Sequence, residues 1–114
     1  MLIVESKLVE KIVEAAQDKK AEDIVVLDVR GISILADYFI ICSGSANTQV
    51  RAVATSIEHR LEDEEVYVDR KEGLDGGRWA VLDYSDAIVH IFHKDEREHY
   101  DLERLWGDAK RIEV

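Results

Sequence analysis

The sequence predicts an α/β (α+β) fold in which helices flank a mixed five-stranded sheet, in the order α-β-β-α-β-β-β-α. Three observations lead to this prediction. Two segments repeat apolar residues at helical spacing, several short runs are apolar and β-branched, and a strand is followed by a helix and a further strand. The chain has 114 residues, 46% of them apolar, which suits a single domain over residues 1–114 with one core.

The helices are expected at residues 6–20, at residues 48–63 and from Asp95 to Gly107. Apolar residues at four-residue spacing form one stripe in the first segment, and Ser6 can cap its amino end. The second segment has apolar residues at i, i+3, i+4 and i+7, and either Asn47 or Thr48 can cap it. The third opens with Asp95 and Glu98, which resemble a capping box.

The strands are expected at residues 23–29, 38–43, 66–71, 78–84 and 86–93. The first two runs are apolar on both faces, which is typical of strands covered on both sides. The last two are separated by Ser85 alone and should form a tight antiparallel hairpin. Alternation in the final strand directs Ile88 and Phe92 to one face, and Val89 and Ile91 to the other.

Charge limits the kinds of partner that the chain can bind. Lysine and arginine number 15 and aspartate and glutamate 25, so the net charge is −10. Nucleic-acid affinity depends on basic side chains that displace counterions, so this composition argues against a DNA- or RNA-binding module. Residues 1–57 carry 6 basic and 8 acidic side chains, whereas residues 58–114 carry 9 and 17. We therefore expect a basic partner to meet mainly the second half of the chain.

Cysteine content and apolar runs favour a cytoplasmic protein. Cys42 is the single cysteine, so no internal disulfide forms and the fold needs no oxidising compartment. No apolar run reaches the roughly 18 residues of a membrane span. The first residues lack the basic start and apolar stretch of a signal peptide.

Gly44 and Ser45 lie between a buried strand and a helix start, where free backbone amides can bind a phosphate. Nucleotidyltransferases open with such a pair and then need two or three carboxylates on a neighbouring strand to hold magnesium. No Asp-x-Asp occurs at the required place, and Asp28 and Asp83 lie on separate strands, where each can hydrogen-bond a turn. A nucleotide-binding enzyme is the alternative function. The simpler interpretation is a turn glycine with a capping serine.

Three histidines, His90, His93 and His99, raise the question of a metal site. Strand alternation directs His90 and His93 to opposite faces, so they cannot bind one ion without distortion, and no cysteine pair is present. Cys42 with a histidine could form a nucleophile pair, but a cysteine within a continuous apolar strand is more often a core residue. We therefore expect no metal site and no cofactor.

Trp79 is the residue that best fits a protein-binding site. It follows a turn with two glycines and shares a strand face with Val81 and Asp83. A large aromatic side chain beside a turn and among acids is typical of an interaction hot spot, and a core position is the alternative interpretation. The charged helix that follows has Tyr100 and Trp106, which either dock it on the sheet or present it to a partner.

Two sequence blocks resemble a known family. The first runs from Leu27 to Ser45 and continues into the following helix at Gln49-Val50. The second runs from Trp79 to His93 and continues through the distinctive Tyr-Asp-Leu-Glu-Arg-Leu-Trp run that ends at Trp106. Together they extend from about residue 6 to residue 109 and resemble the ribosomal silencing factor (Iojap-like) family. Lys94 departs from the pattern, because many relatives carry proline there.

This resemblance implies a protein that is not an enzyme. It implies a fold similar to that of nucleotidyltransferases, without the catalytic carboxylates. It also implies binding to the large ribosomal subunit through the ribosomal protein numbered fourteen, where the small subunit would dock. Subunit joining would be blocked sterically, and translation lowered when nutrients are short. The implied partner is basic, which agrees with the acidic second half of the chain.

The partner-binding role is carried over to the predicted hairpin and the helix beside it. We expect Trp79 to act as the anchor and the nearby carboxylates to meet lysine and arginine side chains. The expected partner-binding residues are Trp79, Val81, Asp83, Tyr84, Asp86, His93, Tyr100 and Glu103. Little direct contact with RNA and none with a membrane is expected. An exposed edge of the sheet leaves a homodimer open.

Overall fold

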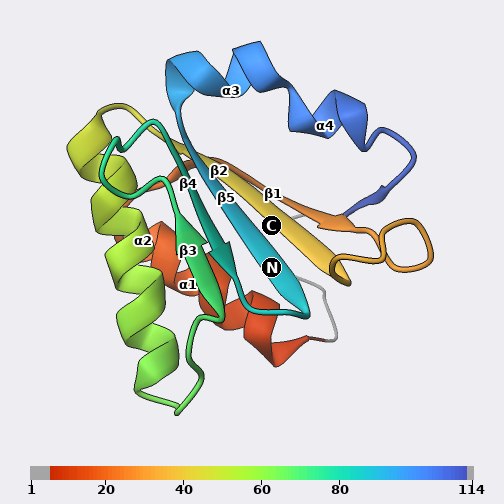
Figure 1. Cartoon of the computed structure of the whole chain (residues 1–114), viewed down its shortest axis with the longest axis horizontal. Coiled ribbons are helices and arrows are strands. Elements are labelled where there is room, and N and C mark those ends of the chain that lie inside the picture. The colour runs from red at the N-terminus through yellow and green to blue at the C-terminus, as the bar shows by residue number, and fades with distance from the viewer. Residues whose placement is uncertain (1–5, 113–114) are drawn as a thin grey trace.

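Figure 1 shows the computed structural model, which describes residues 6–112. One sheet of six strands forms its centre, in the order β3-β4-β5-β2-β1-β6. The strands are β1 (Glu22–Asp28), β2 (Tyr38–Gly44), β3 (Arg70–Glu72), β4 (Trp79–Asp83), β5 (Ala87–His93) and β6 (Lys110–Ile112). The helices are α1 (Lys7–Asp18), α2 (Asn47–Glu62), α3 (Lys94–Tyr100) and α4 (Leu102–Leu105). The predicted mixed sheet with flanking helices is confirmed.

The sequence predicts five strands and the structure has six. The additional strand, β6, pairs antiparallel with β1, and its Lys110 lies opposite Asp28. β6 is only three residues long and begins with Lys110 and Arg111, so its sequence shows no strand periodicity. Only its long-range pairing with β1 defines it as a strand. The predicted strand at 66–71 is also displaced, because regular pairing with β4 begins at Arg70.

A parallel pair of strands, β2 and β5, lies at the centre of the sheet, with Ile40 opposite Val89. The chain passes from β2 to β5 through α2, β3 and β4, which agrees with the crossover that the sequence predicts. The predicted antiparallel hairpin of β4 and β5 is confirmed, with Trp79 opposite Phe92. It turns at Ser85, which has a positive φ of 68°.

Each face of the sheet has its own core, and each core has its own pair of helices (Figure 1). The larger core lies between the sheet and α1 and α2, and it includes Val89 and Ile91. The smaller core lies on the second face, includes Ile88 and Phe92, and is packed against by Leu102 and Trp106 of the carboxyl-terminal segment. The predicted alternation along β5 is therefore confirmed.

The amino ends of α1 and α2 are capped in different ways. Ser6 caps α1 as expected, because its Oγ accepts a backbone N–H of the first turn at 3.3 Å. The prediction of Asn47 or Thr48 as the cap of α2 is wrong, because Ala46 occupies that position and has no side chain that could accept a hydrogen bond. Gln49, in the first turn, hydrogen-bonds to the backbone that precedes the helix instead.

The final helix is predicted as one segment and is divided into α3 and α4. Asp101 separates them in a left-handed conformation with φ 47°, which aspartate tolerates better than most residues. Its N–H donates to the carbonyl of Arg97 at 2.9 Å and closes α3. After this turn the chain runs back over the sheet, and Trp106 packs edge-on against Phe39 with ring centroids 5.0 Å apart.

Candidate functional site

An aromatic cluster lies on the second face of the sheet, beside α3. Trp79 of β4 stacks on Phe92 of β5 with ring centroids 4.9 Å apart, and it packs against Tyr100 of α3 at 4.5 Å. Phe92 is fully buried, whereas Trp79 is half-buried and Tyr100 is exposed. Trp79 is thus fixed by neighbouring rings while part of its surface faces solvent. The sequence allowed Trp79 to be either a core residue or a contact residue, and each interpretation describes part of its environment.

His90 contributes a hydrogen bond to this cluster in its neutral form. The indole N–H of Trp79 donates to Nδ1 of His90 at 3.1 Å, so this nitrogen carries no proton in the folded protein. Burial lowers the pKa of His90 to about 4, because the charged ring would lose its hydration. His90 therefore orients the Trp79 side chain at neutral pH.

The lowered pKa of His90 predicts that the fold weakens in mild acid. A histidine whose pKa falls on folding favours the folded state above its ordinary value of 6.5 and loses that contribution as the pH falls towards about 4. The full loss is about 3 kcal/mol for this shift. Urea unfolding between pH 7 and 4 should show it. His90→Gln, which does not titrate, should have a flatter profile, and equal slopes for both proteins would contradict the assignment.

Val81 and Asp83 extend the surface around Trp79 along the same face of β4. Both are partly exposed, and they alternate with buried residues that face the other core. Asp83 Oδ1 accepts the N–H of Ser85 at 2.8 Å, which is the turn contact that the sequence predicts for it. One carboxylate oxygen therefore fixes the hairpin while the side chain remains partly open to a partner.

The structure separates Tyr84 from Trp79 and leaves Asp86 exposed. Tyr84 is 6% exposed and lies in the core under α1 and α2, on the opposite face of the sheet. Burial, followed by the carboxylates of Glu58 and Glu62, raises the pKa of its hydroxyl. Asp86 lies at the hairpin turn, where its carbonyl accepts the N–H of Asp37 at 2.9 Å. Its side chain is free to extend the acidic surface.

His93 does not join the aromatic cluster. Strand alternation places it on the face of β5 opposite to Phe92. Its Nδ1 accepts the N–H of Asp95 at 3.2 Å, which makes His93 the N-cap of α3. The predicted capping pair of Asp95 and Glu98 is therefore wrong, because a side chain at the end of β5 already bonds to this N–H. Tyr100 is the residue of α3 that meets Trp79.

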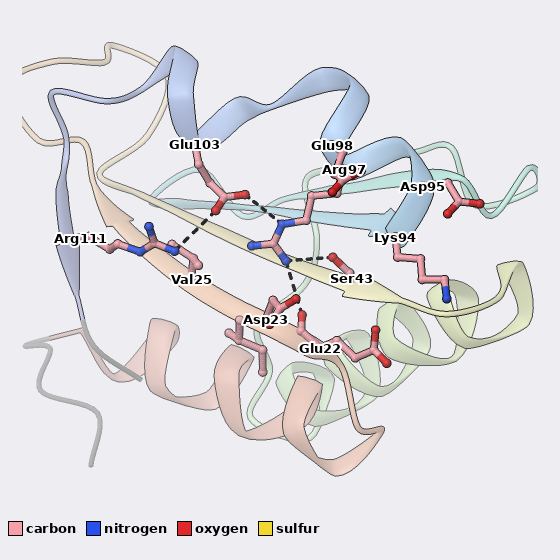
Figure 2. Close-up of a pocket in the computed structure, with 11 residues that line it drawn as sticks. Glu22, Asp23, Val25, Ser43, Lys94, Asp95, Arg97, Glu98, Glu103 and Arg111 are labelled. Atoms are coloured by element: carbon pink, nitrogen blue, oxygen red, sulfur yellow. Dashed lines mark hydrogen bonds and ion pairs between the residues drawn. The ribbon is translucent and has the colours of Figure 1, made fainter.

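Glu103 takes part in a second cluster, around a polar hollow of about 660 Å³ between the start of β1, the end of β2 and the carboxyl-terminal segment (Figure 2). Arg97 lies at its centre. Its Nε donates to Glu103 at 2.9 Å and its Nη1 donates to Ser43 Oγ at 2.8 Å. Glu103 also pairs with Arg111 of β6 at 3.5 Å. Through Arg97, these interactions connect the carboxyl-terminal segment to β2. The structural role of Glu103 is therefore to hold this segment in place.

The charge of the hollow does not suit a nucleotide. Five acidic side chains line it against three basic ones, and the most buried cation, Arg97, already has three hydrogen bonds to the protein. A phosphate needs a positive environment. Sequence reasoning missed Arg97 as an organising residue. The available signal was a single basic residue within the acidic run from Asp95 to Glu98.

The residues of the enzymatic alternative do not come together. The backbone N–H of Ser45 donates to Oε1 of Gln49 at 2.6 Å, and the glutamine amide donates in turn to the carbonyl of Lys20 at 3.0 Å. Asp28 and Asp83 lie at the same end of the sheet, but β2 and β5 separate them and alternation directs them to opposite faces. The two aspartates therefore cannot share one magnesium ion.

The remaining candidate groups are separate from one another. Within residues 6–112, no three His, Cys, Asp or Glu side chains meet in an arrangement that could hold a metal ion. Cys42 is fully buried in β2, and burial raises the pKa of its thiol to about 12, which suppresses the reactive thiolate. Over the same residues, no helix has the length and apolar character needed to cross a membrane.

Comparison with known proteins identifies the family. Residues 4–114 match the family model described as "Ribosomal silencing factor during starvation". The chain belongs to this family. It is 50% identical to the ribosomal silencing factor RsfS of Bacillus subtilis over 95 residues, which are 83% of this chain and 80% of the relative. The resemblance of the two sequence blocks to this family is thereby confirmed.

Solved structures of similar proteins support the same conclusion. A crystal structure from Bacillus halodurans has a TM-score of 0.85 at 40% identity and covers 95% of this chain and 98% of its own. One from Chromobacterium violaceum has a TM-score of 0.88 at 32% identity, with 92% and 88% covered. The overall fold is therefore shared with these relatives. The assignment of particular residues to partner binding stays a prediction.

Proposed function

We propose that this protein represses translation by binding the large ribosomal subunit and preventing its joining with the small subunit. The observation that carries the proposal is the match of residues 4–114 to a family described as silencing the ribosome during starvation. The contact on the large subunit is the ribosomal protein numbered fourteen, as the resemblance implies. Nutrient limitation is the condition under which the block lowers translation.

The surface around Trp79 supports this kind of partner. A half-buried indole held by Phe92 and Tyr100 is a fixed apolar anchor, and fixed anchors lose little conformational freedom on binding. The carboxylates of Asp83 and Asp86 lie along the same hairpin. Lysine and arginine side chains of a basic ribosomal protein complement them, which speeds encounter and sets orientation. Contact is with protein more than with RNA, since the chain has a net charge of −10.

The proposed mechanism is stoichiometric and needs no catalysis. One bound protein occludes the subunit interface, so the effect should saturate when the large subunit is saturated. The separation of Asp28 from Asp83 supports a factor that does not transfer nucleotides. The protein acts in the cytoplasm, where the subunits join.

Purified protein added to separated subunits should lower the yield of joined ribosomes in a sucrose gradient. Asp86→Lys, which reverses a charge on the proposed surface, should raise the protein concentration needed for the effect. Asp18→Lys makes the same change at an exposed site on α1, on the other face of the sheet, and should act like the parent protein. No effect of saturating parent protein would refute the proposal. Equal losses for the two variants would remove the surface assignment.

A further inference from the structure

The connection between β1 and β2 exposes three large apolar side chains. We call residues 31–35 the apolar loop. Ile32, Ile34 and Leu35 are 47%, 102% and 65% exposed. Single exposed apolar residues are common, but three within four positions on one loop form a patch that gains free energy when covered. Within residues 6–112, no packing contact explains an isoleucine at position 34, since its side chain is fully exposed to solvent.

The backbone of the apolar loop is fixed by local hydrogen bonds. The N–H groups of Ile32 and Ser33 donate to the carbonyl of Val29 at 3.0 and 2.9 Å. The N–H of Leu35 donates to Ser33 Oγ at 3.0 Å. At the base, the N–H of Val29 donates to the carbonyl of Asp37 at 2.9 Å. The loop therefore presents its apolar side chains from a defined backbone, which lowers the entropy cost of docking them.

The apolar loop leaves the sheet at the end where the acidic hairpin turns. Asp28 of β1 pairs with Tyr38, which pairs with Ala87 at the start of β5. The carbonyl of Asp86 accepts N–H groups from Asp37 and Tyr38 at 2.9 and 3.1 Å, and so connects the hairpin to the loop. Five aspartates lie at this end of the sheet, and three basic residues lie among them, so its net charge is negative: the acids are Asp28, Asp37, Asp69, Asp83 and Asp86, and the bases are Arg30, Arg70 and Lys110. An apolar projection thus lies beside an acidic edge.

We propose that the apolar loop inserts into an apolar recess rimmed by lysine and arginine on a basic protein. The inference rests on the proposed function, and it adds a second contact to the surface around Trp79. Charge complementarity favours this occupant, because the carboxylates beside the loop would meet the basic rim. A second copy is disfavoured, since it would bring the same carboxylates of two chains with net charge −10 together. RNA is disfavoured by the same acidic edge.

Sedimentation of the purified large subunit with the full chain tests this contact. Ile34→Ser with Leu35→Ser should weaken binding by about tenfold or more, because both side chains lose their buried apolar contact. The factor should be similar at low and high salt, since apolar burial is not screened. Leu105→Ser removes a side chain of α4 that is 73% exposed and should leave binding unchanged.

The outcomes separate this inference from the function on which it rests. If the parent chain fails to bind the large subunit, the proposed function fails. If the parent binds and the double variant binds equally well, or if Leu105→Ser weakens binding as much, the loop contact alone is refuted. A photoreactive residue at position 34 should crosslink to a ribosomal protein of the large subunit. A crosslink to RNA, or to a second copy of this chain, would overturn the assignment of the occupant.

Discussion

Trp79→Ala should weaken binding to the large subunit by more than about 30-fold, equivalent to about 2 kcal/mol. The indole is half-buried, stacks on Phe92 at 4.9 Å and donates a hydrogen bond to His90 at 3.1 Å. The same truncation should lower the free energy of unfolding by about 3 kcal/mol, because the rings around it lose their contacts. Binding by sedimentation and unfolding in urea measure the two effects separately.

Trp106→Ala is the matched control for this prediction. Trp106 is also a half-buried tryptophan of the second face, and it packs against Phe39 at 5.0 Å. Its truncation should cost similar stability and leave binding to the large subunit close to that of the parent. If both folded variants bind equally weakly, destabilisation explains the loss. If Trp79→Ala folds and binds like the parent, the anchor assignment is wrong, and if it abolishes folding, Trp79 is a core residue.

The part of the fold set by local pattern could be predicted from the sequence. Continuous apolar runs produce β1 and β2, and alternation correctly divides β5 between Phe92 on one face and Val89 and Ile91 on the other. The hairpin of β4 and β5 could be predicted because the residues between the two strands are too few for any other connection. The same alternation of side chains along β4 and the residue after it places Tyr84 on the face opposite Asp83, and the structure agrees.

Features that depend on distant contacts could not be predicted in this way. β6 exists because Lys110 and its neighbours find the free edge of β1, more than 80 residues earlier in the chain. Arg97 reaches Ser43, 54 residues away, and that contact holds the carboxyl-terminal segment over the sheet. The turn at Asp101 follows from the same packing, since helix propensity alone favours continuation through this run. Nothing in local periodicity encodes these three contacts.

Gly73→Ala should be the most destabilising change in the turn that leads to Trp79, by about 3 kcal/mol or more. Gly73 has a φ of +77°, and a Cβ added there would lie 1.9 Å from the carbonyl oxygen of Trp79. The clash is with backbone, so no side-chain rotation relieves it. The Gly73 carbonyl also accepts the N–H of Gly77 at 3.2 Å, and the turn thereby fixes the start of β4. Binding to the large subunit should fall with the displacement of Trp79.

Two other glycines separate backbone strain from the clash. Gly31 has a φ of +79° with no atom within 4 Å of an added Cβ, so Gly31→Ala should cost only the conformational penalty, about 1 kcal/mol. Gly76 lies in the same turn as Gly73 with neither a positive φ nor a close neighbour, and Gly76→Ala should be neutral or slightly stabilising. Urea unfolding at one temperature ranks the three variants. Equal losses for Gly73→Ala and Gly31→Ala would show that the backbone around Trp79 moves freely, and the indole would then not be the fixed anchor that binding requires.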